Sequence, residues 1–497
     1  MLRTVLLAGI SAFAFVACAV HEAPKPVIKA DRGGELFARH CAMCHGATGD
    51  ADTSVARMLL PRPNAFRDGL FKLVSTSNGV PTNDDLIATL RRGMPGSSMM
   101  SYGWMPDDDL QALAAEVQRL TLDGRAEQIL ATAHITREPM TAEQALATAE
   151  RQLLPDATVI ANFNSPATAS QLTEGERLYE RHCAGCHGID GRGLATTRNW
   201  PTDGTWLRPR DFTAGYLRGG ASHRQLAYRV RAGMPAAHMP PVMLADPETH
   251  ALVAYVRTLI PDEAMDHHVQ WRRNLHIESG PALKALSDVS FDGVDAVRLP
   301  LVPLRWRANG IEEAWLRVRH DGDNMVMQLE WEDATRDDRV HPSLVLGDGV
   351  AIQFATTTDT PLFAMGSAAA PVNIWRWHAF DPKETAGMVD LMMTPPHSGL
   401  DDSARVQPTP RSESIQLEGL QSVGDATANG LPLEVRTSWH EGRWRVTFRR
   451  SLAPRGREVD LTGSHPVLFA IAIWDGSKDR GPGSKSITTW HQLVLAR

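Results

Sequence analysis

Cysteine is scarce in this chain, and its scarcity limits the redox centres that the protein can hold. Only five cysteines occur in 497 residues. Four stand in two short motifs, and the fifth, Cys18, lies near the N-terminus. No thiols remain for a structural disulfide or for an iron–sulfur cluster, which usually takes four cysteine ligands. Any further redox centre would therefore use other ligands.

An excess of positive charge and long apolar segments are also missing. The chain has 51 Lys and Arg residues against 58 Asp and Glu residues, a formal net charge of −7. Nucleic-acid binding needs a basic face that neutralises phosphates, so we expect no nucleic-acid partner. No segment after Val20 is long and apolar enough to cross a bilayer. The length exceeds what one core organises and predicts about three domains.

Residues 1–20 have the pattern of an export signal. Arg3 precedes an apolar run that ends at Val20, as in a secretory signal peptide. The segment Phe15-Val16-Ala17-Cys18 resembles a bacterial lipobox with Phe in place of the usual Leu, which would make Cys18 a lipid tether. Ordinary cleavage after Ala17-Cys18-Ala19 fits the small-residue rule equally well. Both alternatives predict a periplasmic protein.

Two copies of a Cys-x-x-Cys-His motif carry the main chemical signal. Two thiols three positions apart can form thioether bonds to both vinyl groups of one haem, and the following histidine can bind its iron. Such pairs also bind zinc or act as redox dithiols, but the export signal and the two histidines favour haem. We therefore expect two covalent c haems. The attachment residues are Cys41, Cys44 and His45 in the first motif and Cys183, Cys186 and His187 in the second.

The sequence around the two motifs is duplicated. The motifs are offset by 183 − 41 = 142 residues, and Met99 and Met239 by 239 − 99 = 140 residues. Each unit ends in an amphipathic pattern with apolar residues at three-to-four spacing, which predicts a helix. We expect two α-helical cytochrome c domains, residues 31–122 and 173–261. The linker, residues 123–172, should contain a helix that starts near Thr141.

The second axial ligand of each iron must come from another part of its unit. Met99 and Met239 lie in loops that resemble the loop of small class I cytochromes c that carries the distal methionine. Thioether sulfur favours ferrous iron and raises the reduction potential. Met94 and Met234 are interpreted as core residues. The remaining competitors are Met100 and Met105 for the first iron and His238 for the second.

After Ile260 the pattern changes from helices to strands. Apolar and polar residues alternate from Leu433 to Trp439 and from Trp444 to Phe448, on either side of a Gly-containing turn, which predicts a β-hairpin. Asp321-Gly322 between two further apolar segments predicts another. Many short strands punctuated by Gly and Pro predict a mainly-β sandwich over residues 270–497.

Part of this region resembles a known family. The segments Trp331–Thr335, Asp348–Phe354 and Trp474–Gly476 are similar to the haem-binding gamma subunits of the ethylbenzene dehydrogenase type, whose relatives serve dimethylsulfide dehydrogenase and the selenate and chlorate reductases. The resemblance covers about residues 290 to 497. It implies a non-covalent b haem in the sandwich, ligated by one methionine and one lysine. The simplest members of the family lack cytochrome c domains, so this chain would be a fused version.

The resemblance assigns the two b-haem ligands to Met365 and Lys485. Met365 stands in a Phe-x-Met-Gly segment before a Trp-x-Trp motif, and Lys485 stands a few residues before Trp490. Lys478 is the alternative lysine. A lysine must lose its proton to bind iron, and burial in an apolar pocket favours the neutral amine. Tryptophans and Phe363 would form the pocket walls.

These observations predict an exported electron-transfer protein rather than an acid–base catalyst. The resemblance implies that it docks on the iron–sulfur subunit of a molybdoenzyme and exchanges electrons with a soluble or membrane carrier. A di-haem peroxidase is one alternative, although it generally needs an iron with an open coordination position. The other is a cytochrome fused to a carbohydrate-binding β-sandwich, because 13 tryptophans would suit stacking on sugars.

Overall fold

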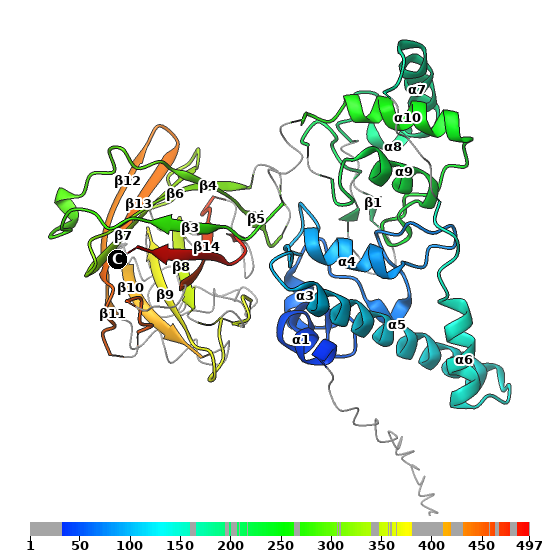
Figure 1. Cartoon of the computed structure of the whole chain (residues 1–497), viewed down its shortest axis with the longest axis horizontal. Helices are drawn as coiled ribbons and strands as arrows, with labels where there is room; N and C mark the ends of the chain where they lie inside the picture. Colours follow the sequence, from blue (N-terminus) through cyan, green and yellow to red (C-terminus); the bar gives the residue numbers. More distant parts are fainter. Residues whose placement is uncertain are drawn as a thin grey trace, which may run out of the picture.

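The computed structural model describes most of the chain from Arg32 onward (Figure 1). The export segment with Cys18, and the alternative lysine Lys478, lie outside the described residues. The described residues are 32–159, 166–193, 198–199, 206–207, 209–215, 217–262, 269–305, 307, 310–338, 347–355, 357, 360–363, 365–379, 411–418, 431–456, 458–462, 467–477 and 485–496. None of the helices among them is long and apolar enough to cross a membrane.

The first helical unit is closed by contact between its first and last helices. α1 (Arg32–His40) packs against α5 (Asp107–Thr136). At their crossing, a Cβ on Gly33 would lie 2.4 Å from the carbonyl oxygen of Ala112, so the two backbones approach as closely as only glycine allows. The other elements are α2 (Ala42–His45), α3 (Ser54–Met58), η1 (Phe66–Asp68) and α4 (Asn83–Arg92).

α5 extends beyond the predicted end of the first domain. Three aspartates occupy its first turn, where the helix dipole favours negative charge. The prediction ended this domain at Leu122, but the helix continues to Thr136. It continues because α6 (Ala142–Gln152) folds back against it. Thr141 caps α6 with a reciprocal capping box, as the sequence predicted.

The second helical unit repeats the plan of the first. α7 (Ala169–His182) packs against α10 (Asp246–Thr258), and a Cβ on Gly175 would lie 2.1 Å from the carbonyl oxygen of Ala251. The glycine crossing of the first unit is therefore duplicated. The other elements are α8 (Ala184–His187), β1 (Arg198–Asn199), β2 (Trp206–Leu207), α9 (His223–Ala232) and η2 (Pro235–Ala237).

The C-terminal region is rich in β-strands and contains two sheets. The larger has nine strands, with the order β11-β10-β9-β8-β14-β15-β5 and with β16 and β3 joined to β14. Its strands are β3 (Asn274–Ile277), β5 (Val302–Pro303), β8 (Gly349–Ala355), β9 (Val372–His378), β10 (Arg411–Leu417), β11 (Leu431–Pro432), β14 (Val467–Trp474), β15 (Ser486–Ile487) and β16 (His491–Leu495). The smaller has the order β12-β13-β7-β6-β4. Its strands are β4 (Val297–Pro300), β6 (Glu313–His320), β7 (Asn324–Glu332), β12 (Glu434–His440) and β13 (Arg443–Ser451). The short η4 (Leu286–Asp288) precedes β4.

Aromatic side chains from both sheets meet in one core. Trp375 of β9 lies 4.6 Å from Phe354 of β8 and 6.3 Å from Phe448 of β13, measured between ring centroids. All three are buried. Both predicted hairpins are confirmed, as β6–β7 and β12–β13. The expected division into helical cytochrome units followed by a β-rich region therefore agrees with the structure.

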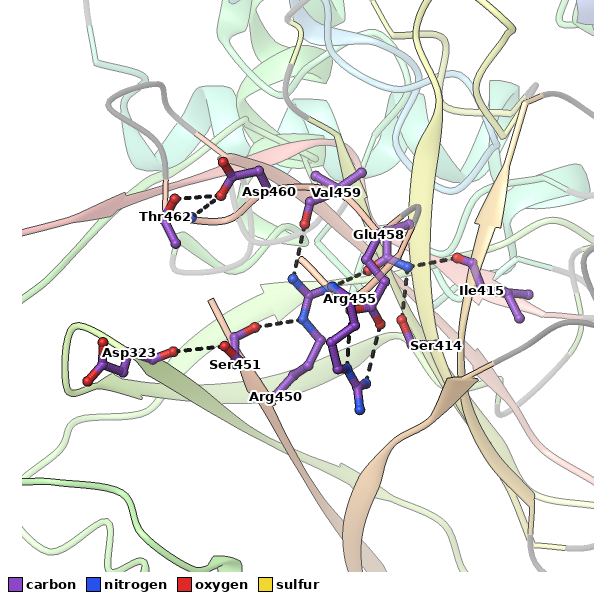
Figure 2. Close-up of polar contacts among 11 residues, drawn as sticks. Asp323, Ser414, Ile415, Arg450, Ser451, Arg455, Glu458, Val459, Asp460 and Thr462 are labelled. Carbon is purple, nitrogen blue, oxygen red and sulfur yellow. Dashed lines mark hydrogen bonds and ion pairs between the residues drawn. The ribbon is translucent and has the colours of Figure 1, made fainter. Parts of the chain in front are cut away.

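A buried polar network also joins the two sheets (Figure 2). Arg450 of β13 donates hydrogen bonds to the side chain of Asn373 in β9, at 2.8 Å, and to the carbonyl of Val459, at 3.0 Å. Its guanidinium lies 3.5 Å from the Glu458 carboxylate, and both side chains are almost fully buried. A buried arginine is tolerated when its donors are satisfied in this way.

The first helical unit lies between the second unit and the β region (Figure 1). On one side, the Leu60 amide donates to the Leu304 carbonyl at 3.0 Å, which joins the unit to the β region. On the other, the Ala236 amide of the second unit donates to the Phe71 carbonyl at 3.1 Å. The chain thus places its first Cys-x-x-Cys-His motif in the middle part of the molecule.

Candidate haem sites

The first Cys-x-x-Cys-His motif lies at the junction of α1 and α2 and faces a cavity. Cys41, Cys44 and His45 line this cavity, which encloses about 1150 Å³ between atoms, including its opening to solvent. The other walls are mainly apolar. They include Phe37, Leu59, Phe66, Phe71, Leu86, Leu90, Leu113 and Val117. Both thiols and the imidazole are therefore directed toward one apolar space, as covalent attachment of a haem requires.

The second motif faces a similar and larger cavity in the second unit. Cys183, Cys186 and His187 line a space of about 1740 Å³, again including its opening. Its walls include Tyr179, Phe212, Leu217, Leu226, Val230, Val242, Val253 and Val256. The local duplication seen in the sequence is thus also a duplication of cavities.

Each motif histidine is oriented by the same pair of contacts. The Nδ1 atom of His45 lies 3.0 Å from the Asn64 carbonyl oxygen, and that of His187 lies 3.2 Å from the Arg210 carbonyl oxygen. A carbonyl only accepts, so Nδ1 carries the proton and Nε2 keeps the lone pair that can bind iron. Each ring also stacks on a phenylalanine at 4.5 Å and 17°, with Phe66 in the first unit and Phe212 in the second.

The protonation of these groups suits haem better than a dithiol centre. Burial lowers the pKa of His45 to about 4, and it also lowers the pKa of His187. Both imidazoles are therefore neutral near pH 7. Burial raises the pKa of Cys41 and of Cys44 to about 12, whereas reactive dithiols have lowered thiol pKa values. Among the described residues, the motifs also form no Cys–His cluster tight enough for a metal ion alone.

The methionine loop of the first unit lies across the cavity from its histidine. Met99 lines the cavity, as predicted for a distal ligand. Met100 packs instead among residues of the β region, and Met105 lies in the core of the first unit, so neither competitor lines the cavity. Met94, interpreted from the sequence as core, also lines the cavity and is only partly buried.

The second unit has the corresponding arrangement. Met239 lines its cavity, together with Met234 and His238. The expectation that Met234 fills the core is therefore wrong in the same way as for Met94, because the turn that follows α9 directs this residue toward the cavity. His238 has a positive φ of 54°, an uncommon conformation for a residue other than glycine.

A glycine holds each methionine loop closed. Gly93 and Gly233 end α4 and α9 with positive φ values of 71° and 68°. A Cβ on Gly93 would lie 2.6 Å from the Met99 carbonyl oxygen, and one on Gly233 would lie 2.5 Å from the Met239 carbonyl oxygen. The position therefore requires glycine both for its backbone conformation and for its close contact.

A third cavity lies in the β region and contains the two residues assigned by resemblance. Met365 and Lys485 line a space of about 480 Å³. They are only 3% and 6% exposed, respectively. The Lys485 ammonium lies 5.2 Å from the centroid of the Trp474 ring. Met365 has a positive φ of 52°, and such backbone strain often occurs at functional sites. Apolar walls come from Leu304, Ala351, Leu362, Ile374, Ala470 and Ile487.

Phe363 links the third cavity to the first. The sequence predicted it as a wall of the b-haem pocket, and it does line the cavity of Met365 and Lys485. It also lines the cavity of the first Cys-x-x-Cys-His motif. One aromatic side chain of the β region thus separates the two spaces, a contact that no local sequence pattern indicated.

Two apolar cavities, each with a Cys-x-x-Cys-His motif and an oriented histidine, define two cytochrome c domains that imply covalently bound haem c. The chain is therefore a multihaem protein that contains cytochrome c and transfers electrons. Family models agree with both units. The cytochrome c model matches residues 172–259, and the model for cbb3-type cytochrome c oxidase subunit III matches residues 29–115.

Comparison with whole proteins gives more distant relatives. A Haloferax mediterranei protein described as a respiratory nitrate reductase haem subunit is 25% identical over 188 residues, which are 37% of this chain. The match spans 56% of the length of that curated relative. A solved chain from a reducing HAO-like protein complex of Kuenenia stuttgartiensis is 25% identical and covers 48% of this chain and 100% of its own, with a TM-score of 0.38. A family 9 carbohydrate-binding module from Caldicellulosiruptor kristjanssonii is 9% identical and covers 45% of this chain and 97% of its own, with a TM-score of 0.25.

Proposed function

We propose that this chain is an exported electron-transfer subunit of a redox complex, with two c haems and one b haem. The observation that carries the proposal is a continuous series of three cavities. Arg218 lines both cytochrome c cavities, and Phe363 lines the first of them together with the cavity of the β region. A protein that moves electrons in steps needs such a close succession of cofactor sites.

In this proposal the axial ligands are one pair of residues for each haem. His45 and Met99 bind the first c haem, and His187 and Met239 bind the second. Met365 and Lys485 bind the b haem. The support is that each pair lines a single cavity. The haems supply the redox chemistry, while the protein sets their ligands, excludes water and tunes their potentials.

The third cavity fits a non-covalent haem in its chemistry. It brings together a thioether and an amine, with mostly apolar walls and no cysteine. Its tryptophan does not suit the alternative of sugar binding, because Trp474 is buried at 1% exposure. Trp331 and Trp375, in the core of the same region, are also fully buried. Sugar-stacking surfaces need exposed rings.

The proposed partner is the iron–sulfur subunit of a molybdenum enzyme, which exchanges electrons with the b haem. The resemblance of the β region and the relative described as a nitrate reductase haem subunit support this partner class. The second cytochrome c domain would then face a soluble or membrane electron carrier. Export to the periplasm, and a lipid tether on Cys18 if the lipobox is used, belong to the same proposal.

The proposal is tested by counting haems in freshly purified, haem-replete protein. Acid–acetone extraction should remove one b haem per chain and leave two c haems attached. A pyridine haemochrome spectrum of each fraction gives the count. Absence of extractable haem would contradict the role of Met365 and Lys485 and leave a protein with two c haems only. A resting spectrum with a high-spin, five-coordinate c haem would instead favour the peroxidase alternative.

A further inference from the structure

We propose that the first c-haem site is completed by the second cytochrome c domain, through Arg218 and Arg210. Arg218 would be a cation shared by both c haems, and Arg210 would be a positioning residue for the Met99 loop. The inference rests on the proposed ligation of the first iron by Met99. It adds that the potential of the first haem depends on residues of another domain.

Arg218 reaches two haem cavities from one position. It belongs to the second domain and lines that domain's own cavity, but it also lines the cavity of the first domain. Its Nε atom is buried. The chemical group that a guanidinium recognises best is a carboxylate, and a haem carries two of them as propionates. The position of Arg218 therefore suits contact with propionates of both haems.

Arg210 connects the proximal side of one haem to the distal loop of the other. Its carbonyl oxygen accepts the hydrogen bond from His187, at 3.2 Å. Its guanidinium donates to the carbonyl oxygens of Pro95 and Gly96, at 3.3 and 3.4 Å, in the loop that leads to Met99. A substitution of the Arg210 side chain keeps the carbonyl, so the His187 contact should survive while the contact with the first domain is lost.

The interface around these residues is closely packed and positively charged. Arg229 of α9 donates a hydrogen bond to the Val74 carbonyl across the same interface. A Cβ on Gly219, next to Arg218, would lie 3.1 Å from the Cδ atom of Arg229 and 3.3 Å from a methyl carbon of Leu73 in the first domain. Burial, together with the charge of Arg92, lowers the pKa of Arg229 to about 10, although Asp85 opposes the shift. Buried cations at a domain interface are stabilised by nearby anions, which haem propionates would supply.

The expected electrostatic effect has a definite sign. A cation close to a haem disfavours the ferric state, which carries one more positive charge than the ferrous state, and so raises the reduction potential. Removing the charge of Arg218 should therefore lower the potentials of both c haems. Removing the Arg210 side chain should loosen the Met99 loop and weaken methionine ligation of the first iron.

The experiment uses full-length, haem-replete protein with Arg218→Gln and Arg210→Gln, and Arg224→Gln as the matched control. Arg224 is an exposed arginine of α9 that lines neither cavity. Spectroelectrochemical titration should show both c-haem potentials shifted downward in Arg218→Gln. They should be nearly restored in Arg218→Lys and unchanged in Arg224→Gln. In a Met239→Ala background, Arg210→Gln should reduce the remaining charge-transfer band of methionine-ligated ferric haem.

The outcomes separate this inference from the ligand assignment. If Met99→Ala leaves the spectrum of the first haem unchanged, the proposed ligation itself is wrong. If Met99→Ala abolishes the methionine band but Arg218→Gln shifts neither haem, or only the second, the shared cation is refuted. An unaltered methionine band in Arg210→Gln would refute the positioning role. A shift of equal size in Arg224→Gln would show a general charge effect and would also overturn the proposal.

Discussion

Met365 and Lys485 face one buried cavity, although they lie on segments separated by much of the β-region sequence. A thioether and an amine are both soft enough donors to complete the coordination of a haem iron. Their meeting in an apolar space is the structural basis of the proposed b-haem site, and it makes that site testable by substitution.

Met365→Ala and Lys485→Ala should each abolish or strongly reduce extractable b haem, because each removes one of two axial ligands. Both c haems should remain, since their attachment is covalent. Lys284→Ala is the control, because Lys284 is an exposed lysine of the same region. Haem content per chain after acid–acetone extraction measures the effect. Full b-haem content in Lys485→Ala would reject this residue as a ligand.

Met239→Ala should shift the potential of one c haem sharply downward, because loss of thioether ligation removes a ligand that favours ferrous iron. Met234→Ala is a matched control, since Met234 lines the same cavity but is assigned no bond to iron. Redox titration of both variants gives the comparison. If the large shift occurs in Met234→Ala instead, the two methionines exchange roles. His238 becomes the candidate ligand if neither variant shifts.

Phe363→Ala should slow electron exchange between the first c haem and the b haem. The ring lies at the boundary of both cavities, so its loss would replace a packed path with space or water. Flash-reduction kinetics measure the exchange rate, and potentiometry checks that both driving forces are preserved. Phe363→Tyr should retain most of the rate. Equal rates in the alanine variant and the wild type would exclude Phe363 from the path.

Gly124→Ala should destabilise the first cytochrome c domain by about 1–3 kcal/mol, the usual cost of overpacking. A Cβ at this position would lie 2.0 Å from the Arg67 Cβ and 2.5 Å from its Cα, on the turn that also carries Phe66. Gly280→Ala is the control, because its nearest neighbour would be 3.5 Å away. Denaturant unfolding followed by haem absorbance reports the difference. Equal midpoints for the two variants would contradict the packing argument.

The β region should lose stability as the pH rises from about 4 to about 8. Burial and the carboxylates of Asp348 and Asp475 raise the pKa of Asp333 from 3.8 to about 8, and burial raises that of Asp348 to about 6. The folded chain therefore binds these protons more tightly than the unfolded chain, and the stabilisation is present at low pH and lost on ionisation. Asp333→Asn cannot ionise and should flatten this dependence in denaturant titrations. A pH profile identical to that of the wild type would contradict the buried-carboxylate account.

The parts of the site that could be predicted from the sequence are those with local spacing. Cys41, Cys44 and His45 stand within one turn of chain, and Met99 was found because the same offset recurs at Met239. A duplicated pattern supplies its own control. The orienting contact of His45 with Asn64 was not predicted, because it depends on how a loop of no fixed pattern returns to the motif.

Contacts between domains were beyond the reach of the sequence for a physical reason. The guanidinium of Arg210 binds backbone carbonyls, which every residue has, so no complementary residue marks its partner in the chain. The extension of α5 to Thr136 was missed for a related reason. Its last turns are held by α6 and not by an apolar stripe facing the core of the domain.

The crossing of the first and last helices in each unit offers a practical fingerprint. Gly33 lies 41 − 33 = 8 positions before the first motif cysteine, and Gly175 lies 183 − 175 = 8 positions before the second. In both places a side chain would collide with the backbone of the opposite helix. A glycine eight places ahead of a haem-attachment motif should therefore help to select, from unassigned sequences, units that can pack their helices in this way. Chains with a larger residue there should need a wider separation of the two helices.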